Sequence, residues 1–266
     1  MSGPVRIRFL GHSTVLLELG GVRLLTDPIL RRRVGPLVHA NALPEAHVPD
    51  DVTAVLISHS HWDHLDIGSL RMLGTATPIL VPRGLGGRIR GRGFREVIEL
   101  LPGEATRVGE VGIRAVPAHH RGLPRPLAPP APAIGYVLDA GPRVYFPGDT
   151  ALFAGMETLA PDLDLALMPV WGWGPRARSS EHLDPLGAAQ ALRLLRPRVA
   201  IPIHWGTLHP LGFRWLRPST RTDPPHAFAR LAAEHAPETE VRVLAIGERT
   251  AIEPAAAAPP APSVAR

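Results

Sequence analysis

The sequence predicts a single α/β domain, and three observations lead to that fold class. The chain has 266 residues, a length that suits one sizeable hydrophobic core better than two small ones. Its composition, 45% hydrophobic and 20% charged, is that of an ordinary globular protein. Short apolar runs of strand character alternate with turn signals and with two segments of helical pattern.

The expected elements follow one another along the whole chain. The first two expected strands flank Gly11-His12-Ser13. Gly20-Gly21 predicts a hairpin turn between the second strand and the third. Two arginine-containing segments, 31–50 and 84–94, are expected to be loops, and the Ala/Pro-rich residues 254–266 a disordered tail after a domain of residues 1–253. We expect strands at 5–10, 14–19, 22–26, 54–57, 78–81, 111–116, 143–146, 165–168, 199–203 and 241–245, and helices at 67–73 and 225–235.

The residue types that are missing exclude several chemistries. There is no cysteine, so a disulfide framework, a thiolate zinc site and a cysteine nucleophile are all excluded, and any metal must be held by histidine and carboxylate. Every basic residue is arginine, and the formal net charge is +5. The arginines of segment 84–94 lack interleaved aromatic residues, so nucleic acid is not the expected partner.

The chain begins without the apolar core of a signal peptide, and no run of about 18 apolar residues occurs. We therefore expect a cytoplasmic protein. Peripheral contact with a membrane remains open, and the sequence does not indicate an oligomeric state.

The densest chemical signal directly follows the apolar run 54–57. His59 and His61 are two residues apart, so on extended chain both face the same side and can share one metal ion. Asp63 and His64, past the bend, can reach a second ion nearby. Zinc, manganese and iron all accept such nitrogen and oxygen ligands. We interpret this segment as a metal site; the alternative is a loop with three solvated histidines.

Three later apolar runs end in the same manner. His119 and His120 follow one of them, Asp149 follows the next, and His204 follows the third. A lone histidine after a strand is more often buried and hydrogen-bonded than a ligand. Four such strand ends in one chain favour a single convergent site, because the sheet holds residues at strand ends rigidly while the loops stay accessible.

In this order, these motifs resemble the metallo-β-lactamase superfamily, whose hallmark is a His-x-His-x-Asp-His run. The resemblance extends from about residue 5 to 250 and implies a four-layer αββα sandwich with a dinuclear site at one edge of the two sheets. A narrower branch, with N-acyl-phosphatidylethanolamine-hydrolysing phospholipase D and, more distantly, the L-ascorbate-6-phosphate lactonase group, is similar in three segments. These are Gly11-His12-Ser13, Glu181-His182-Leu183-Asp184-Pro185 and Ile203-His204-Trp205-Gly206-Thr207.

The resemblance also implies a set of ligands. His119 is left as an alternative to its neighbour in this set, and His12 and Asp27 are expected to orient ligands. His182 lies outside the set and either contacts an anionic group of the substrate, donates a proton or caps a turn. The first ion would be held by His59, His61 and His120, the second by Asp63, His64 and His204, with Asp149 as the bridge.

The implied enzyme is a metal-dependent hydrolase with two divalent ions, zinc being the first choice and manganese or iron the alternatives. Its water nucleophile would pass a proton to Asp63 or Asp149. An anionic small molecule, a phosphodiester or a phosphorylated ester, is the expected substrate. The second candidate function is that of a lactonase or thioester hydrolase, and it ranks ahead of a nuclease or a non-catalytic binding protein. Arginines near the motifs either bind the anion or are surface charge: Arg121, Arg125, Arg176 and Arg178.

Overall fold

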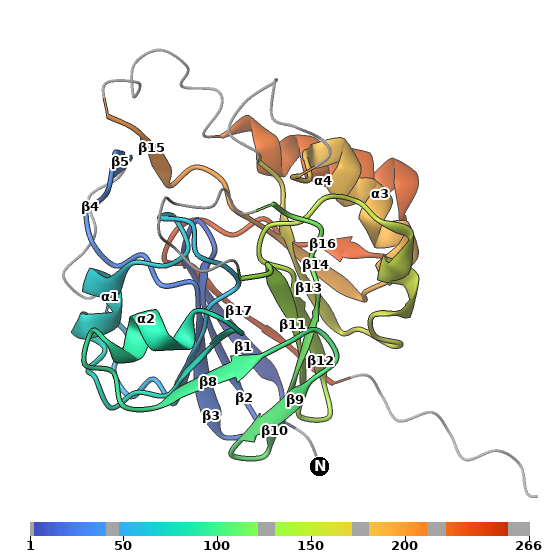
Figure 1. Cartoon of the computed structure of the whole chain (residues 1–266). Helices are drawn as coiled ribbons and strands as arrows, with labels where there is room; N and C mark the ends of the chain where they lie inside the picture. The colour runs from blue at the N-terminus through green and yellow to red at the C-terminus, as the bar shows by residue number, and fades with distance from the viewer. Residues whose placement is uncertain (1–2, 41–47, 122–130, 172–180, 212–221, 255–266) are drawn as a thin grey trace, which may run out of the picture.

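The computed structural model describes residues 3–40, 48–121, 131–171, 181–211 and 222–254. Two seven-stranded sheets pack face to face, and helices cover the outer face of each sheet (Figure 1). This is the four-layer αββα arrangement, so the predicted fold class is confirmed.

The first sheet is antiparallel at its N-terminal strands and parallel beyond them. β1 pairs antiparallel with β2 and β2 with β3, whereas β3, β6, β7 and β8 run parallel. The strand order is β17 (Arg249–Ile252), β1 (Val5–Gly11), β2 (Thr14–Leu19), β3 (Val22–Thr26), β6 (Ala54–Leu56), β7 (Ile79–Pro82) and β8 (Val97–Leu100).

The second sheet has the same mixture of directions. β9 to β12 form an antiparallel meander, and β12, β13, β14 and β16 run parallel. The strand order is β16 (Glu240–Val241), β14 (Val199–Ile203), β13 (Leu165–Pro169), β12 (Arg143–Phe146), β11 (Ile134–Asp139), β10 (Val111–Pro117) and β9 (Ala105–Val108).

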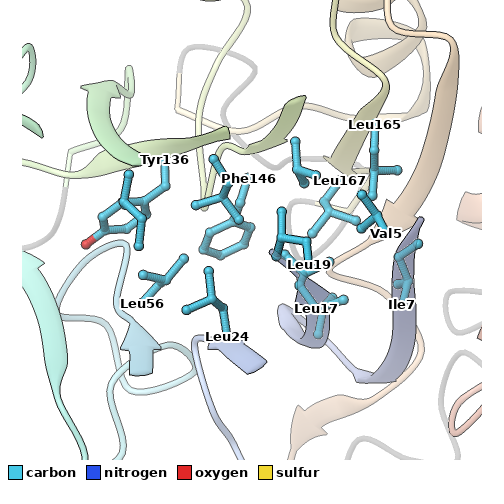
Figure 2. Close-up of a cluster of buried hydrophobic side chains, with 14 of the residues drawn as sticks. Val5, Ile7, Leu17, Leu19, Leu24, Leu56, Tyr136, Phe146, Leu165 and Leu167 are labelled. Atoms are coloured by element: carbon cyan, nitrogen blue, oxygen red, sulfur yellow. The ribbon is translucent and has the colours of Figure 1, made fainter. Parts of the chain in front are cut away.

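The main hydrophobic core fills the space between the two sheets. Leu24 and Leu56 of the first sheet point toward Tyr136 and Phe146 of the second, and all four side chains are fully buried (Figure 2). The hydroxyl of Tyr136 donates hydrogen bonds to the carbonyl oxygens of Ile57, at 2.8 Å, and of Leu80, at 3.2 Å, and so ties the two sheets together. Alternation along each strand places the other side chains outward.

Two further cores lie beneath the helices. Buried side chains of the first sheet pack against α1 and α2, and those of the second sheet pack against α3, α4 and η2. Aspartates begin two of these helices, because the side chain of Asp66 accepts a hydrogen bond from Ser69 N and that of Asp184 from Gly187 N. The helices are α1 (Ile67–Met72), α2 (Gly86–Arg90), η2 (Ala154–Thr158), α3 (Pro185–Leu195) and α4 (Asp223–His235).

Three of the expected elements differ in the structure. Segment 84–94, expected to be a loop, contains α2, and part of segment 31–50 forms a small sheet of β4 (Arg33–Val34), β5 (Leu37–His39) and β15 (Leu208–Pro210). The expected strand at 241–245 is wrong. Strand β16 ends at Val241, because the chain then leaves the second sheet and joins β1 of the first sheet as β17.

None of the helices in the described part of the chain is long and apolar enough to cross a membrane. Residues 255–266 lie outside the described residues, so the expected Ala/Pro-rich tail stays a prediction.

Candidate metal centre

Loops after five strands meet at one edge of the sandwich. The loop after β1 provides a histidine, the loop after β6 provides three histidines and an aspartate, and the loops after β10, β12 and β14 provide one residue each. The side chains brought together are those of His12, His59, His61, Asp63, His64, His120, Asp149 and His204.

These side chains form two groups, each able to hold one cation. In each group, four candidate ligand atoms lie within 4.8 Å of one another. One group consists of His59, His61, His120 and Asp149, and the other of His12, Asp63, His64 and His204. The structure thus brings together all seven residues of the implied ligand set, with His12 beside them.

Asp149 lies between the two groups. It belongs to the first by distance, and its Oδ1 atom is 3.4 Å from Nε2 of His64 and 3.2 Å from Nε2 of His204, both in the second group. A carboxylate in this position has an oxygen within reach of each group. The resemblance to the metallo-β-lactamase superfamily implies a bridging role for the same residue.

Hydrogen bonds from the protein fix which ring nitrogen of each histidine faces the centre. Four of the histidines turn Nδ1 toward a protein oxygen, which leaves Nε2 for a cation, as is usual for histidines that bind metals. The Nδ1 contacts are His59 to Ser58 Oγ at 2.9 Å, His64 to Asp27 Oδ2 at 2.6 Å, His120 to the Glu181 carbonyl at 2.8 Å and His204 to the Trp171 carbonyl at 2.6 Å.

His61 has the opposite orientation. Its Nδ1 atom lies 2.9 Å from Nε2 of His59 and 3.2 Å from Nε2 of His120, so three ring nitrogens converge on one point. At that point, one cation can accept a lone pair from each of the three rings.

Several buried polar atoms at the centre lack hydrogen bonds. Within the described ranges, Nε2 of His64 and both carboxylate oxygens of Asp149 are buried without a hydrogen-bond partner. A buried polar atom without a hydrogen-bond partner lowers the stability of the fold, and coordination to a cation would remove that cost. The donor set of imidazole nitrogens and carboxylate oxygens therefore fits divalent zinc, manganese or iron.

The pKa values of the first group suit metal ligation. Burial lowers the pKa of His61 to about 4, and burial together with the neighbouring His64 lowers that of His59 well below its ordinary value. Burial also lowers the pKa of His120. These imidazoles are therefore neutral at pH 7, the form in which histidine binds a metal.

The carboxylates are held ionised. Burial raises the pKa of Asp149, but the nearby His204 and His64 lower it by a larger amount, so the net pKa lies well below the ordinary value. The same balance, with His64 and His12 as the partners, lowers the pKa of Asp63. Burial lowers the pKa of His64, but the surrounding carboxylates raise it by more, so the net pKa lies well above the ordinary value. A cation that binds Nε2 of His64 must therefore displace a proton.

Backbone strain is concentrated at the site. Six non-glycine residues of the described chain have positive φ, and three of them are His12 at 52°, Asp27 at 32° and His204 at 60°. A left-handed conformation costs a non-glycine residue of order 1–3 kcal/mol and persists where the surroundings enforce it. Here the NH of His204 donates to the carbonyl of His12 at 2.7 Å, which locks two of these residues together.

The structure separates His119 from His120. His120 joins the first group, whereas His119 is exposed and its ring stacks on Phe153 with a centroid distance of 4.1 Å. His182 lies beside the centre, with Nδ1 3.4 Å from Oδ2 of Asp149. Arg121 is exposed, and the other three arginines considered as anion ligands, at 125, 176 and 178, lie outside the described residues.

Some of the groups that hydrogen-bond to the proposed ligands were not predicted from the sequence. The carbonyls of Glu181 and Trp171 give no signal in the sequence, because every residue carries one. Ser58 could have been noticed, since it is a polar residue at the end of a buried strand. Its NH and hydroxyl donate to Asp27 at 2.7 and 2.6 Å. The carboxylate of Asp27 thus contacts His64 on one side and Ser58 on the other, the orienting place expected for it.

Comparison with known proteins agrees with this geometry. The family model described as the beta-lactamase superfamily domain matches residues 22–205. A UPF0173 metal-dependent hydrolase of Opitutus terrae is 35% identical over 254 residues, which cover 92% of this chain and 98% of that protein. The N-acyl-phosphatidylethanolamine-hydrolyzing phospholipase D 1 of Caenorhabditis elegans is 33% identical over 232 residues, 77% of this chain and 64% of its own length.

A solved structure resembles the whole fold. Igni18, a metallo hydrolase from the archaeon Ignicoccus hospitalis, has a TM-score of 0.70 and 25% identity, with coverage of 94% of this chain and 99% of that one. This chain belongs to the beta-lactamase superfamily domain family. It spans 62% of the length of its mycobacterial relatives. The predicted family is confirmed, and the enzyme class implied by the resemblance agrees with the names of these relatives.

Proposed function

We propose that this chain is a metal-dependent hydrolase that uses two divalent cations, with zinc as the first choice. The observation that carries the proposal is the position of Asp149 between two groups of candidate ligand atoms, in which four of the histidines have Nδ1 held by a protein oxygen. Support comes from the metal-dependent hydrolase of Opitutus terrae, which this chain matches over nearly its full length.

Each cation would have its own ligands. His59, His61 and His120 would hold the first, Asp63, His64 and His204 the second, and Asp149 would contact both. When bound, such cations act as Lewis acids and lower the pKa of a water from 15.7 toward about 7.

The side chains at the edge of the centre would handle protons and the substrate. The carboxylates of Asp63 and Asp149 are ionised and belong one to each group of ligand atoms, so either could receive the proton of a water activated there. His182 contacts Asp149 through Nδ1 and is partly buried, so it can donate a proton to the leaving group or contact an anionic substrate. No serine or cysteine nucleophile is required.

For the substrate, we propose an anionic small molecule with a phosphodiester or a phosphorylated ester. The support is the phospholipase D relative of Caenorhabditis elegans, whose name describes the hydrolysis of a phospholipid. A lactone or thioester is the second candidate, because the same arrangement of carboxylates and imidazoles also serves attack on a carbonyl carbon.

The experiment combines metal analysis with turnover. We expect about two equivalents of metal per chain and chelator-sensitive cleavage of a generic phosphodiester, restored by added zinc. The Asp149→Ala variant should lose hydrolysis and retain the fold by circular dichroism. Asp139→Ala, an exposed aspartate of β11 that pairs with Arg143, serves as the control and should keep activity.

The possible outcomes separate the parts of the proposal. Cleavage of a lactone alone would move the substrate to the second candidate and leave the centre intact. Full activity in Asp149→Ala, or a purified protein that binds no divalent metal, would contradict the two-cation centre itself.

A further inference from the structure

A second polar feature lies on the first sheet, on the face that points away from the core. Along β1, Ile7 points into the core, so Arg6 and Arg8 point outward. The same face carries Arg23 of β3 and Arg249 of β17. Four arginines from three strands therefore share one surface of the sheet.

Two of these arginines are direct cross-strand neighbours. Arg8 of β1 lies opposite Arg249 of β17 in the antiparallel register. Directly opposed residues have Cβ atoms about 4.5–5.5 Å apart, and like charges in that position are destabilising. Burial lowers the pKa of Arg8, and the charges of Arg249 and Arg23 lower it further. The two like charges therefore repel each other across the two strands.

The carboxylates nearby do not balance this charge. Among the described residues, Glu18 is the one acidic residue that lines the surface, and its Oε1 lies 3.4 Å from Nε of Arg23. Within the described parts of the chain, Arg6, Arg8 and Arg249 form no ion pair, and Nε of Arg8 is buried without a hydrogen-bond partner. An anionic ligand would supply the acceptor that this buried N–H of the partly buried Arg8 lacks.

The surface is hollowed at the same place. A cavity of about 300 Å³ lies over the four arginines, with the buried Leu16 among its lining residues. This volume is at the lower end of the range for small-molecule sites. Guanidinium groups bind phosphate oxygens through paired N–H donors, and several arginines around one hollow favour that anion.

Two macromolecular partners fit less well. The lining, as far as the described part of the chain forms it, contains no aromatic residue on which the bases of a single-stranded nucleic acid could stack. The exposed large hydrophobic side chains of the described residues, Trp62, Met72, Leu152, Leu186 and Leu211, are not among the lining residues, so nothing here would insert into a membrane.

We propose that this hollow is a binding site for a small molecule with a phosphate group, which Arg8 and Arg249 hold between them. It is separate from the metal centre. Arg8 is four residues before His12, or about 13 Å along the strand at ~3.3 Å per residue, and it lies on the outer face of the sheet. The proposal does not depend on the hydrolytic function.

The test uses the metal-loaded protein with inorganic phosphate as the probe. Thermal unfolding is followed at rising phosphate concentration, with chloride at matched ionic strength as the reference. We expect a saturable rise in melting temperature for the wild type. In Arg249→Gln the apparent affinity should fall about tenfold or more, because a charged hydrogen bond contributes about 1.5–3 kcal/mol and each 1.4 kcal/mol is tenfold. Arg8→Gln should lose affinity similarly.

Arg230→Gln is the matched control. Arg230 is an exposed arginine of α4, on the opposite side of the sandwich, and it also forms no ion pair within the described chain. This variant should bind phosphate like the wild type. Without phosphate, at low salt, Arg249→Gln should melt higher than the wild type because the opposed charges are gone. The proposal is overturned if phosphate gives no saturable shift, or if the Arg249→Gln and wild-type affinities are equal.

Discussion

Oδ2 of Asp27 lies 2.6 Å from Nδ1 of His64, although 37 residues of chain separate them. Both side chains are fully buried, and the same carboxylate accepts two hydrogen bonds from Ser58. Asp27 therefore sets the orientation of one proposed ligand directly and, through the Ser58 hydroxyl next to Nδ1 of His59, of a second.

Replacing Asp27 by Asn should weaken metal binding while every proposed ligand stays in place. Loss of a partner that orients a ligand typically costs 10–100-fold in metal affinity or activity. Competition with a chromophoric chelator measures the affinity. Asp139→Asn, at the exposed end of β11, should leave the affinity unchanged. An unchanged affinity in Asp27→Asn would mean that the contact has no part in metal binding.

Replacing His182 by Ala should lower kcat and leave the metal content unchanged. His182 contacts Asp149 but lies outside both groups of ligand atoms, and loss of a general acid usually costs about 10²–10⁴-fold in rate. Kinetics together with metal analysis measure the two effects separately. His119→Ala removes an exposed histidine that stacks on Phe153 and should keep full activity. Loss of metal from the His182 variant would show it to be a ligand instead.

Gly148→Ala should disrupt the centre through the backbone. Gly148 has a φ of +62°, and an added Cβ would clash with Cβ of Ser58. The strain of a left-handed residue is about 1–2 kcal/mol, and the clash adds to it by displacing Ser58 or Asp149. Urea unfolding and metal titration should both show the loss.

Gly21→Ala isolates the conformational part of that effect. Gly21 has a φ of +76°, and an added Cβ would meet no atom within 4 Å. This variant should lose stability but bind metal normally. Equal metal affinity in the two glycine variants would argue against the contact between Gly148 and Ser58.

Alkaline pH should destabilise the fold through its tyrosines. Both tyrosines of the chain, Tyr136 and Tyr145, are fully buried, and burial raises the pKa of each. The unfolded chain loses these protons near pH ~10, whereas the folded protein retains them. Their contribution is therefore complete below that pH and is lost as the pH rises, with a slope of about 1.4 kcal/mol per unit for each tyrosine.

The composition makes this measurement clean, because the chain has neither lysine nor cysteine. Stability is measured by urea unfolding from pH 8 upward, and tyrosinate absorbance reports the ionisation directly. Tyr145→Phe should halve the slope without losing a hydrogen bond, since the Tyr145 hydroxyl makes none within the described residues. Ionisation of the folded protein at the ordinary tyrosine pKa would contradict the expectation.

The sequence predicted the features that depend on local pattern. Apolar runs that end in His59, His120, Asp149 and His204 indicated both the strands and their common edge, and the structure brings these four side chains together. Whether they bind metal stays a prediction until metal is measured. The choice between His119 and His120 required the structure, because both are adjacent to one strand end and only the backbone direction separates them.

Features that depend on pairing over long sequence distances could not be predicted. The pairing of Arg8 with Arg249 joins the two ends of the described chain, and nothing in either strand indicates its partner. The same holds for the pairing of β5 with β15, which are each three residues long and too short for an alternating pattern. The strand expected at 241–245 was misplaced because apolar residues there continue while the chain changes sheets.

The contact between His12 and His204 has a consequence for how the protein is made. Their rings lie 4.0 Å apart, and the NH of His204 reaches back to the carbonyl of a residue near the beginning of the chain. A growing polypeptide on the ribosome can pair its first strands early, but the second group of proposed ligands is incomplete until residue 204 has emerged. If the proposed centre holds two cations, the second would therefore be acquired late in biosynthesis, after most of the two sheets have been synthesised.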